Sequence, residues 1–307
     1  MTQTRIDLET TLGEYRLRSP LVAACGTVGS VTDFAEVADL SVYGAAVAKS
    51  VSGTPWPGRR PPRLAATGAG MLNGIGIQNP GVDTWVETVA PRLPVLATDV
   101  WGSAVGNDVE EFAFVAAQLS TTSVKAIEVN LSCPNLESGR MFALDPVASA
   151  AVVAGVKGAT SLPVGAKLTP NSEDVVAVAG AVAEAGADWV VLGNTVWGAG
   201  FDVNTRRPLL SGVVGGYSGT PIKPIALRCV WEVSQALPRL PIVGIGGVAT
   251  GDDVVEFLLA GASAVAVGTA HFANPRIGAR IIRGLHKYLA KHGVRSPAEL
   301  IGAVQRW

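Results

Sequence analysis

The chain has 307 residues, of which 48% are hydrophobic and only 16% are charged. This length suits one large α/β barrel or two ordinary domains, and the low charged fraction means that much of the chain must be buried. The net charge of −1 and the isoelectric point near 6.3 provide no electrostatic basis for binding nucleic acid or anionic membranes. A mean hydropathy of +0.35 points instead to an apolar association surface.

No membrane span, disulfide framework or metal site is predicted. The amino-terminal residues lack the apolar core of a signal peptide, and the longest uncharged stretch, Phe257 to Pro275, is interrupted by two glycines. The three cysteines are far apart and odd in number, and together with three scattered histidines they show no metal-ligand spacing. We therefore expect a protein of the reducing cytoplasm with no bound metal.

Short runs of Val, Ile, Leu and Ala alternate with amphipathic, alanine-rich stretches along the chain. The runs predict eight strands, in chain order Leu21–Ala24, Ala45–Ala48, Val95–Thr98, Ala126–Val129, Val164–Ala166, Trp189–Leu192, Ile242–Ile245 and Ala264–Val267. The clearest predicted helices are Asp108–Leu119, Pro146–Ala159, Ser172–Ala185, Pro224–Ala236, Gly251–Leu259 and Pro275–Ala290. Asp145 and Asn274, each followed by proline, are expected to be helix N-caps.

Nearly continuous apolar strands that alternate with helices indicate a parallel sheet covered on both faces. Eight such units predict one (β/α)₈ barrel of the TIM type, a single domain over residues 1–307. Excursions are expected at the rim formed by the carboxyl ends of the strands. Residues 1–20 are expected to form an extra strand pair at the opposite end of the barrel.

Every predicted strand is followed by polar, charged or glycine residues. In chain order these are Cys25-Gly26-Thr27, Lys49-Ser50, Asp99, Asn130 with Cys133, Lys167, Asn194-Thr195, Gly246-Gly247 and Gly268-Thr269. In a barrel these positions meet at one rim, where barrel enzymes have their active sites. A single such residue is more often a solvated strand end or, like Asn79 before proline, a turn-former. Eight together predict an active site.

Cys133 is the strongest single candidate for chemistry. It lies in the string Asn130-Leu-Ser-Cys133-Pro-Asn135, just after a predicted strand and between two side-chain amides. A cysteine thiol has an ordinary pKa near ~8.5 that its surroundings can lower, so it can act as a base or a nucleophile. An isolated cysteine is more often a small buried hydrophobic residue. The other strand-end residues favour a catalytic role here.

Glycine pairs after the last two predicted strands indicate a phosphate site. Gly246-Gly247 and Gly268-Thr269 each precede a helix, and free backbone amides at such positions bind phosphate in barrels. The first string also fits a GxGxxA dinucleotide fingerprint, but it does not open a Rossmann unit. Lys49 and Lys167 would suit an anionic substrate or a reduced flavin. The amides of Asn73, Asn130 and Asn194 match a small heterocycle better than a sugar.

Five motifs, in this order along the chain, resemble those of the class 1, B-type dihydroorotate dehydrogenases. They are Met71-Leu-Asn-x-Ile-Gly, Asn-x-Ser-Cys-Pro-Asn, Lys167-Leu-Thr-Pro-Asn, Gly215-Gly-x-Ser-Gly219 and Gly261-Ala-Ser-Ala-Val-Ala-Val-Gly-Thr. The resemblance extends from about Leu21 to Ala273, which is nearly the whole chain. It implies an FMN-containing barrel that oxidises dihydroorotate to orotate in pyrimidine biosynthesis.

The resemblance also implies roles for individual residues. Cys133 would be the base that takes a proton from C5 of the substrate while a hydride passes from C6 to flavin N5. Substrate contacts are expected from Lys49, Asn73, Gly74, Ile75, Gly76, Ile77, Asn130, Asn194 and Thr195. Flavin contacts are expected from Cys25, Gly26, Lys49, Ser50, Asp99, Asn130, Lys167, Gly193, Gly219, Gly246, Gly247, Gly268 and Thr269.

B-type enzymes pair this barrel with a second subunit that carries FAD and a 2Fe–2S cluster and passes electrons to NAD. The present chain lacks cluster cysteines and a Rossmann opening, so the resemblance implies that it needs such a partner to use NAD. The expected assembly is a homodimer, with an accessory subunit completing a heterotetramer. No nucleic-acid or membrane partner is expected.

Several residues depart from the family pattern. Asp99 replaces a common asparagine near the flavin, and its carboxylate either faces the ring, turns outward as a strand-end cap or pairs with a lysine. The other departures are Cys25 for serine, Gly74 for alanine, the segment Ser138-Gly-Arg140-Met-Phe142, Trp197, and Gly200 where arginine is expected.

These changes leave open an FMN barrel that acts on another dihydropyrimidine or uses a fumarate-like acceptor. A dihydrouridine synthase, a flavin scaffold without turnover and a barrel without flavin are more distant alternatives. The first is disfavoured because the chain has no basic extension for RNA.

Overall fold

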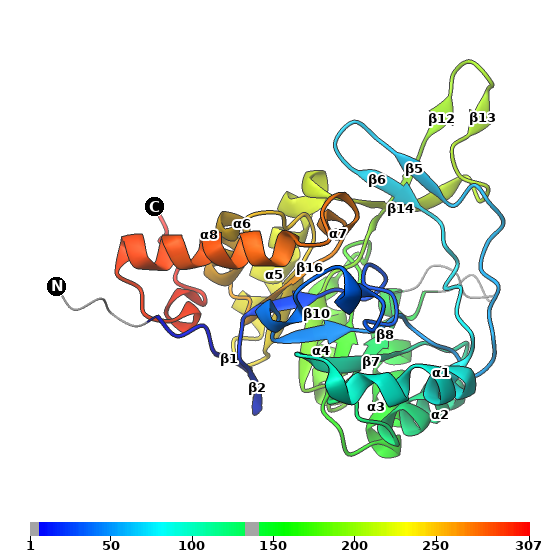
Figure 1. The fold of residues 1–307 in the computed structure, drawn as a ribbon, viewed down its shortest axis with the longest axis horizontal. Helices are drawn as coiled ribbons and strands as arrows, with labels where there is room; N and C mark the ends of the chain where they lie inside the picture. Colours follow the sequence, from blue (N-terminus) through cyan, green and yellow to red (C-terminus); the bar gives the residue numbers. More distant parts are fainter. Residues whose placement is uncertain (1–5, 133–140) are drawn as a thin grey trace.

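A computed structural model describes residues 6–132 and 141–307, and it contains a closed barrel of eight parallel strands (Figure 1). The order around the barrel is β10-β15-β16-β3-β4-β7-β8-β9. In chain order the strands are β3 (Leu21–Ala23), β4 (Ala45–Val47), β7 (Asp99–Ala104), β8 (Ala126–Asn130), β9 (Val164–Lys167), β10 (Trp189–Leu192), β15 (Ile242–Ile245) and β16 (Ala264–Val267). The predicted (β/α)₈ fold is confirmed.

Seven predicted strands lie at or within a residue or two of the observed ones, but the third is wrong. The predicted run, Val95–Thr98, begins at the last residue of the 3₁₀ helix η3 (Ala90–Val95), and the true strand β7 begins only at Asp99. Val95 and Leu96 are apolar, but they end this helix, with Leu96 as its C-cap. Val95 is 85% exposed, which no strand of a covered barrel permits.

Helices pack around the outside of the barrel. They are α1 (Val82–Thr88), α2 (Val109–Ser120), α3 (Pro146–Ala159), α4 (Val175–Glu184), α5 (Lys223–Ala236), α6 (Gly251–Leu259), α7 (Ala270–Ala273) and α8 (Ile277–His292). Further 3₁₀ turns are η1 (Phe34–Glu36), η2 (Leu40–Val42), η4 (Phe142–Leu144), η5 (Thr220–Ile222) and η6 (Pro297–Leu300). None of the helices in the described ranges combines the length and apolar character needed to cross a membrane.

The two predicted N-caps have different outcomes. The Asp145 side chain accepts hydrogen bonds from the first amides of α3, as expected. Asn274 is not a helix N-cap, because it ends the short helix α7 and α8 begins only at Ile277. Its side chain instead accepts a hydrogen bond from the Arg276 amide in the turn between the two helices.

Three small sheets lie outside the barrel. The antiparallel pair β1 (Thr10–Leu12) and β2 (Tyr15–Leu17) lies at the amino ends of the barrel strands, as predicted. At the other end, β5 (Leu64–Ala66), β6 (Met71–Asn73), β11 (Val196–Ala199) and β14 (Val214–Ser218) form an antiparallel sheet in the order β11-β14-β6-β5, which we call the roof sheet. Figure 1 shows β5, β6 and β14 together at one edge, with the pair β12 (Phe201–Asp202) and β13 (Arg207–Pro208) beyond them.

Buried side chains form two clusters separated by the barrel wall. Alternate strand residues point inward and form a small cluster that includes Val22, Val47 and the large rings of Trp101 and Trp189. The other strand residues point outward and pack on the helices in a larger cluster. Within the described part of the chain these side chains fill the interior of the barrel, and the large cavity opens at its carboxyl end.

Candidate active site

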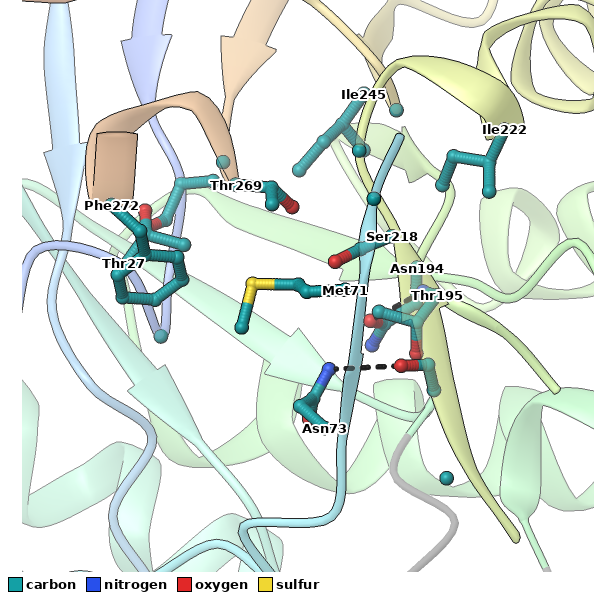
Figure 2. Close-up of a pocket in the computed structure, with 18 of the residues that line it drawn as sticks. Thr27, Met71, Asn73, Asn194, Thr195, Ser218, Ile222, Ile245, Thr269 and Phe272 are labelled. Carbon is teal, nitrogen blue, oxygen red and sulfur yellow. Dashed lines mark hydrogen bonds between the residues drawn. The ribbon is translucent and has the colours of Figure 1, made fainter. Parts of the chain in front are cut away.

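A cavity of about 1700 Å³ opens at the carboxyl ends of the barrel strands, between the strand-end loops and the roof sheet. Figure 2 shows Thr27, Thr269 and Phe272 on one side of this cavity, Asn194 and Thr195 on the other, and Met71 between them. Most of the predicted site residues line it: Cys25, Gly26, Lys49, Ser50, Asn73, Gly74, Ile75, Gly76, Ile77, Asn130, Lys167, Asn194, Thr195, Gly219, Gly246, Gly247, Gly268 and Thr269.

Two described site residues, Gly193 and Asp99, are not among those that line the cavity, and one predicted residue is not described. Cys133 lies outside the described residues, and Gly193 is buried beside the cavity with its amide donating to Ile245. Asp99 does not follow a strand but begins one, so the expectation that it approaches the flavin is wrong. Its carboxylate lies at the amino end of the barrel, where it accepts a hydrogen bond of 2.8 Å from the Tyr15 hydroxyl.

One continuous hydrogen-bonded chain of side chains crosses the floor of the cavity. Asn130 Nδ2 donates to Ser50 Oγ over 3.0 Å, and Ser50 lies 2.9 Å from Ser103 Oγ and 3.3 Å from Cys25 Sγ. On its other side Asn130 Oδ1 accepts from Ser132 Oγ, which in turn accepts from Asn194 Nδ2 over 2.7 Å. The chain joins the ends of five strands, so the polar atoms that face the cavity hold each other in place.

The side-chain amides of Asn73 and Asn171 are each oriented by hydrogen bonds, the first to the roof sheet and the second to a neighbouring loop. Asn73 Nδ2 donates to the Gly216 carbonyl on β14, the contact drawn at Asn73 in Figure 2. Asn171 donates to the Thr195 carbonyl and accepts from the Trp197 amide, which ties the loop after β9 to the loop after β10. Asn79, by contrast, accepts a hydrogen bond from the Gly81 amide within its own turn, so its prediction as a turn-former is confirmed. It also accepts from the amide of Ser52, 27 positions away.

Lys167 is a buried cation at the bottom of the cavity. Its ammonium lies 3.5 Å from the Glu128 carboxylate, and these side chains are only 6% and 2% exposed. Burial lowers the pKa of Lys167, but the neighbouring groups, chiefly the Glu128 carboxylate, together outweigh burial and raise that pKa above its ordinary value. Lys167 therefore keeps its charge at neutral pH and provides a fixed positive group beneath any ligand.

At the predicted phosphate site the amides left free for a ligand are those of the glycines rather than those that begin α6. The Asp253 carboxylate accepts hydrogen bonds from the amides of Ala249 and Thr250, so the first amides before α6 are already used. Gly247 and Gly268 both line the cavity. A Cβ placed on Gly268 would meet nothing closer than 3.8 Å. Protein packing therefore does not require glycine at position 268, and the bare backbone leaves room for a ligand.

A buried histidine in α7 connects this helix to two other segments near the predicted phosphate site. His271 in α7 is 2% exposed, with Nδ1 3.0 Å from Thr27 Oγ1 and Nε2 2.9 Å from the Tyr43 hydroxyl. Because the Thr27 hydroxyl donates to the Ala24 carbonyl, Nδ1 carries the proton and Nε2 accepts from Tyr43. Burial lowers the pKa of His271 to about 4, so the ring is neutral at physiological pH.

Sequence reasoning missed Ser103, Ser132, Glu128, Asn171 and His271. Ser103 would have been predicted as a site residue if β7 had been placed correctly, because it lies near the carboxyl end of that strand. Ser132 lies inside a motif that had already been singled out. Asn171 ends the quoted motif that begins at Lys167, whereas Glu128 and His271 have no signal in the sequence, because their partners lie 39 and at least 228 positions away.

The departures from the family pattern have separate locations. Gly74, Met141 and Trp197 line the cavity, whereas Phe142 packs edge-on against Phe112 on the outside of the barrel. Gly200 lies against the roof sheet, where a Cβ would come within 2.7 Å of Leu209. Arg140 lies outside the described residues.

A family model described as dihydroorotate dehydrogenase matches residues 7–289. The chain is 45% identical to the dihydroorotate dehydrogenase B (NAD(+)), catalytic subunit of a Geobacter species, over 98% of this chain and 99% of that one. It is 40% identical to the subunit of the same name from Alkaliphilus metalliredigens, over 98% of this chain and 100% of that one. DHODH from Eimeria tenella, solved in complex with ferulenol, shares the fold at a TM-score of 0.81 and 18% identity, with 99% of this chain and 90% of that chain covered. The chain therefore belongs to the dihydroorotate dehydrogenase family of oxidoreductases.

Proposed function

We propose that this chain oxidises (S)-dihydroorotate to orotate in pyrimidine biosynthesis, as the catalytic subunit of a B-type dihydroorotate dehydrogenase. The reaction removes a proton from C5 and a hydride from C6 and leaves a C5–C6 double bond. One observation carries the proposal: residues expected to bind the substrate and residues expected to bind the flavin, taken from distant strand ends, line a single cavity. Membership of the family supports the same reaction.

The cavity fits FMN as the resident cofactor. The phosphate would lie on the amides around Gly246, Gly247, Gly268 and Thr269, where the open backbone of Gly268 supports the placement. Lys167, buried and charged beneath the cavity, would favour a flavin that carries negative charge. When bound, FMN supplies the two-electron acceptor for the hydride.

The substrate would lie against the three amides and beside Cys133. Asn73, Asn130 and Asn194 each have a partner that fixes the direction of the side-chain amide. Ser132 bridges Asn130 and Asn194, so the residue immediately before Cys133 is anchored to the floor of the cavity. In this proposal Cys133 accepts the C5 proton as a thiolate, and Lys49 contacts both flavin and substrate.

The proposed route for the electrons leads out of this chain to NAD through a partner subunit with FAD and a 2Fe–2S cluster. The names of the relatives, catalytic subunits of NAD(+)-dependent enzymes, support a separate partner. A homodimer of this chain, joined by two such partners into a heterotetramer, is the proposed assembly.

One anaerobic titration tests the proposal. The purified chain should show a flavin absorption spectrum with one FMN per chain, and added dihydroorotate should bleach it without any partner subunit. NAD should become reduced only when the partner subunit is added. A colourless protein, or a flavin that dihydroorotate leaves oxidised, would refute the proposal. Bleaching by 5,6-dihydrouracil but not by dihydroorotate would indicate a different dihydropyrimidine.

A further inference from the structure

Two loops at the predicted phosphate end of the cavity lie next to each other because their strands are neighbours in the barrel. β16 pairs with β3, and this ladder ends where the Ala24 amide donates to the Val267 carbonyl over 2.9 Å. Beyond that bond no backbone hydrogen bond joins the two loops in the part of the chain that the structure describes. Both loops line the cavity, with Cys25, Gly26 and Thr27 after β3 and with Gly268 and Thr269 after β16. Their spacing therefore depends on side chains.

The side chain of His271 links these two loops. His271 belongs to α7, directly after the loop that follows β16, and it is buried. Its backbone amide donates to the Gly268 carbonyl over 2.9 Å, and its Nδ1–H donates to the Thr27 hydroxyl over 3.0 Å. The Thr27 hydroxyl donates onward to the Ala24 carbonyl over 2.9 Å. His271 therefore holds one loop by its backbone and the other by its side chain.

The far side of the His271 ring is fixed from outside the cavity. Its Nε2 accepts a hydrogen bond from the Tyr43 hydroxyl over 2.9 Å, and the Phe34 ring packs edge-on at a centroid distance of 5.0 Å. Tyr43 is itself confined by the start of α8, where a Cβ on Gly278 would collide with its hydroxyl. His271 is not among the described residues that line the cavity, so it acts on a ligand there only through its neighbours.

The loop that His271 holds has free hydrogen-bond donors. Within the described ranges the amides of Gly268 and Thr269 have no hydrogen-bond partner, and both residues line the cavity. An N–H group shielded from water and without a partner costs free energy, so these amides favour a ligand with strong acceptor oxygens. The Thr27 methyl is the atom nearest to the open space at Gly268, 3.8 Å from where a Cβ would lie. The position of Thr27 therefore sets the room beside these donors.

We propose that His271 is a positioning residue for the cofactor, which acts through Thr27 to fix the spacing of the two loops and thereby aims the free amides at the FMN phosphate. This inference rests on the proposed function only in placing a flavin in the cavity. Charge-assisted hydrogen bonds to phosphate depend on the distance and direction of each N–H. Riboflavin has the same ring and ribityl chain but no phosphate, so its binding should not depend on that direction. The ratio of FMN affinity to riboflavin affinity therefore reports the proposed role.

Two substitutions divide the contacts of His271 between them. The amide of His271→Asn lies near the Nδ1 position and keeps the bond to Thr27, whereas the longer side chain of His271→Gln reaches toward Tyr43 and loses that bond. His271→Asn should keep the wild-type affinity ratio. His271→Gln should lower the ratio roughly fivefold, which corresponds to the loss of about one neutral hydrogen bond.

Thr27→Val tests the same link from its other end. It should lower the ratio as far as His271→Gln does, and the double variant should lower it no further, because both changes remove one shared bond. Fluorescence titration of FMN and of riboflavin into the full chain prepared without cofactor measures both affinities. The exposed His286→Gln is the control and should keep the wild-type ratio.

An unchanged ratio in His271→Gln would overturn the proposal even if both flavins bind more weakly, because an equal loss is what a merely structural histidine gives. A ratio that falls as far in His271→Asn would overturn it as well, because Tyr43 rather than Thr27 would then matter. If His271→Gln does not fold, Thr27→Val decides by the same criterion. Wild-type protein that binds neither flavin would refute the flavin site and this proposal together. A bound flavin that dihydroorotate leaves oxidised would refute the proposed reaction alone.

Discussion

The two ends of the barrel are made from the same eight strands but have opposite character. At the amino end, the Tyr15 ring from the β1–β2 pair packs against Trp101 and Trp189, with ring centroids 5.9 and 5.6 Å away. At the carboxyl end, serine, asparagine and lysine side chains surround a cavity of about 1700 Å³. One end is closed by aromatic packing, and the other is held open by a polar network.

Asp99 shows how much the end of a strand matters. It stands at the amino end, where its carboxylate accepts the Tyr15 hydroxyl and adds to the effect of burial in raising the pKa of Tyr15. Ser103, four residues along the same strand, reaches the floor of the cavity. A residue of β7 therefore serves stability or chemistry according to the end at which it lies.

The largest expected effect is at the carboxyl end. Cys133→Ala should reduce the flavin with dihydroorotate roughly 10²–10⁴-fold more slowly, since general bases contribute rate factors of that size. Stopped-flow absorbance under anaerobic conditions measures this rate, and the wild-type rate should rise with pH as the thiol ionises. Cys229→Ala, in the buried face of α5, is the control and should keep the wild-type rate. A Cys133→Ala rate equal to wild type would rule out Cys133 as the base.

At the amino end we expect a loss of stability instead. Trp189 is fully buried inside the barrel, so Trp189→Ala should lower the free energy of unfolding by about 3–5 kcal/mol. Urea denaturation measures the change. Trp231→Ala is the control, because Trp231 is partly exposed and its cation–π contact with Arg306 contributes about 1 kcal/mol or less. A cost at Trp189 no larger than at Trp231 would contradict the view that aromatic packing closes this end.

His271 should make stability depend on pH. Its pKa in the folded protein is about 4, below the ordinary 6.5, so the unfolded chain binds a proton more readily between these values. The contribution is therefore fully present above pH 6.5 and is lost as pH falls toward 4, by about 3 kcal/mol in all at 1.36 kcal/mol per unit.

Urea denaturation between pH 5 and pH 8 tests this dependence. His271→Asn, which keeps a polar atom near the Nδ1 position, should flatten the profile. The exposed His286→Gln should leave it as in the wild type. A wild-type profile that is already flat from pH 5 to pH 8 would contradict a neutral, buried His271.

The smallest expected effect is that of replacing Asp99, and it tests most directly the difference between the two ends of the barrel. Asp99→Asn should lower the free energy of unfolding by about 1 kcal/mol, because the amide oxygen is a weaker acceptor for the Tyr15 hydroxyl than a carboxylate. It should leave the flavin midpoint potential unchanged, because Asp99 lies at the opposite end of the barrel from the cavity. A shift in that potential, measured by spectroelectrochemistry, would contradict this placement.

The strands that are buried at nearly every position were predicted most accurately from the sequence. Trp189–Leu192, Ile242–Ile245 and Ala264–Val267 are buried at nearly every position and were predicted with their observed bounds. β7 was misplaced because it contains aspartate, glycine and serine, while the run before it, Val95–Thr98, is more apolar. The roof sheet was not predicted, because the pair that joins its two halves, β6 with β14, brings together Asn73 and Gly216, which are 143 positions apart.

The site was predictable to the extent that barrel geometry determines it. Residues directly after strands converge whatever their identity, so Lys49, Asn130 and Asn194 were found from position alone. Glu128 lies within a strand and His271 in a short helix beyond the rim, and both depend on partners that only the tertiary structure provides.

The roof sheet also has a consequence for how the chain is made. Asn73 on β6 and Gly216 on β14 are hydrogen-bonded partners 143 positions apart. During synthesis the β5–β6 hairpin leaves the ribosome long before β14 exists, by on the order of ten seconds at typical elongation rates. Until then one edge of β6 has no partner strand, and unpaired edges are where nascent chains associate wrongly. The order of synthesis thus delays the cover of the cavity until six of the eight barrel strands have been made, with only β15 and β16 of the barrel still to come.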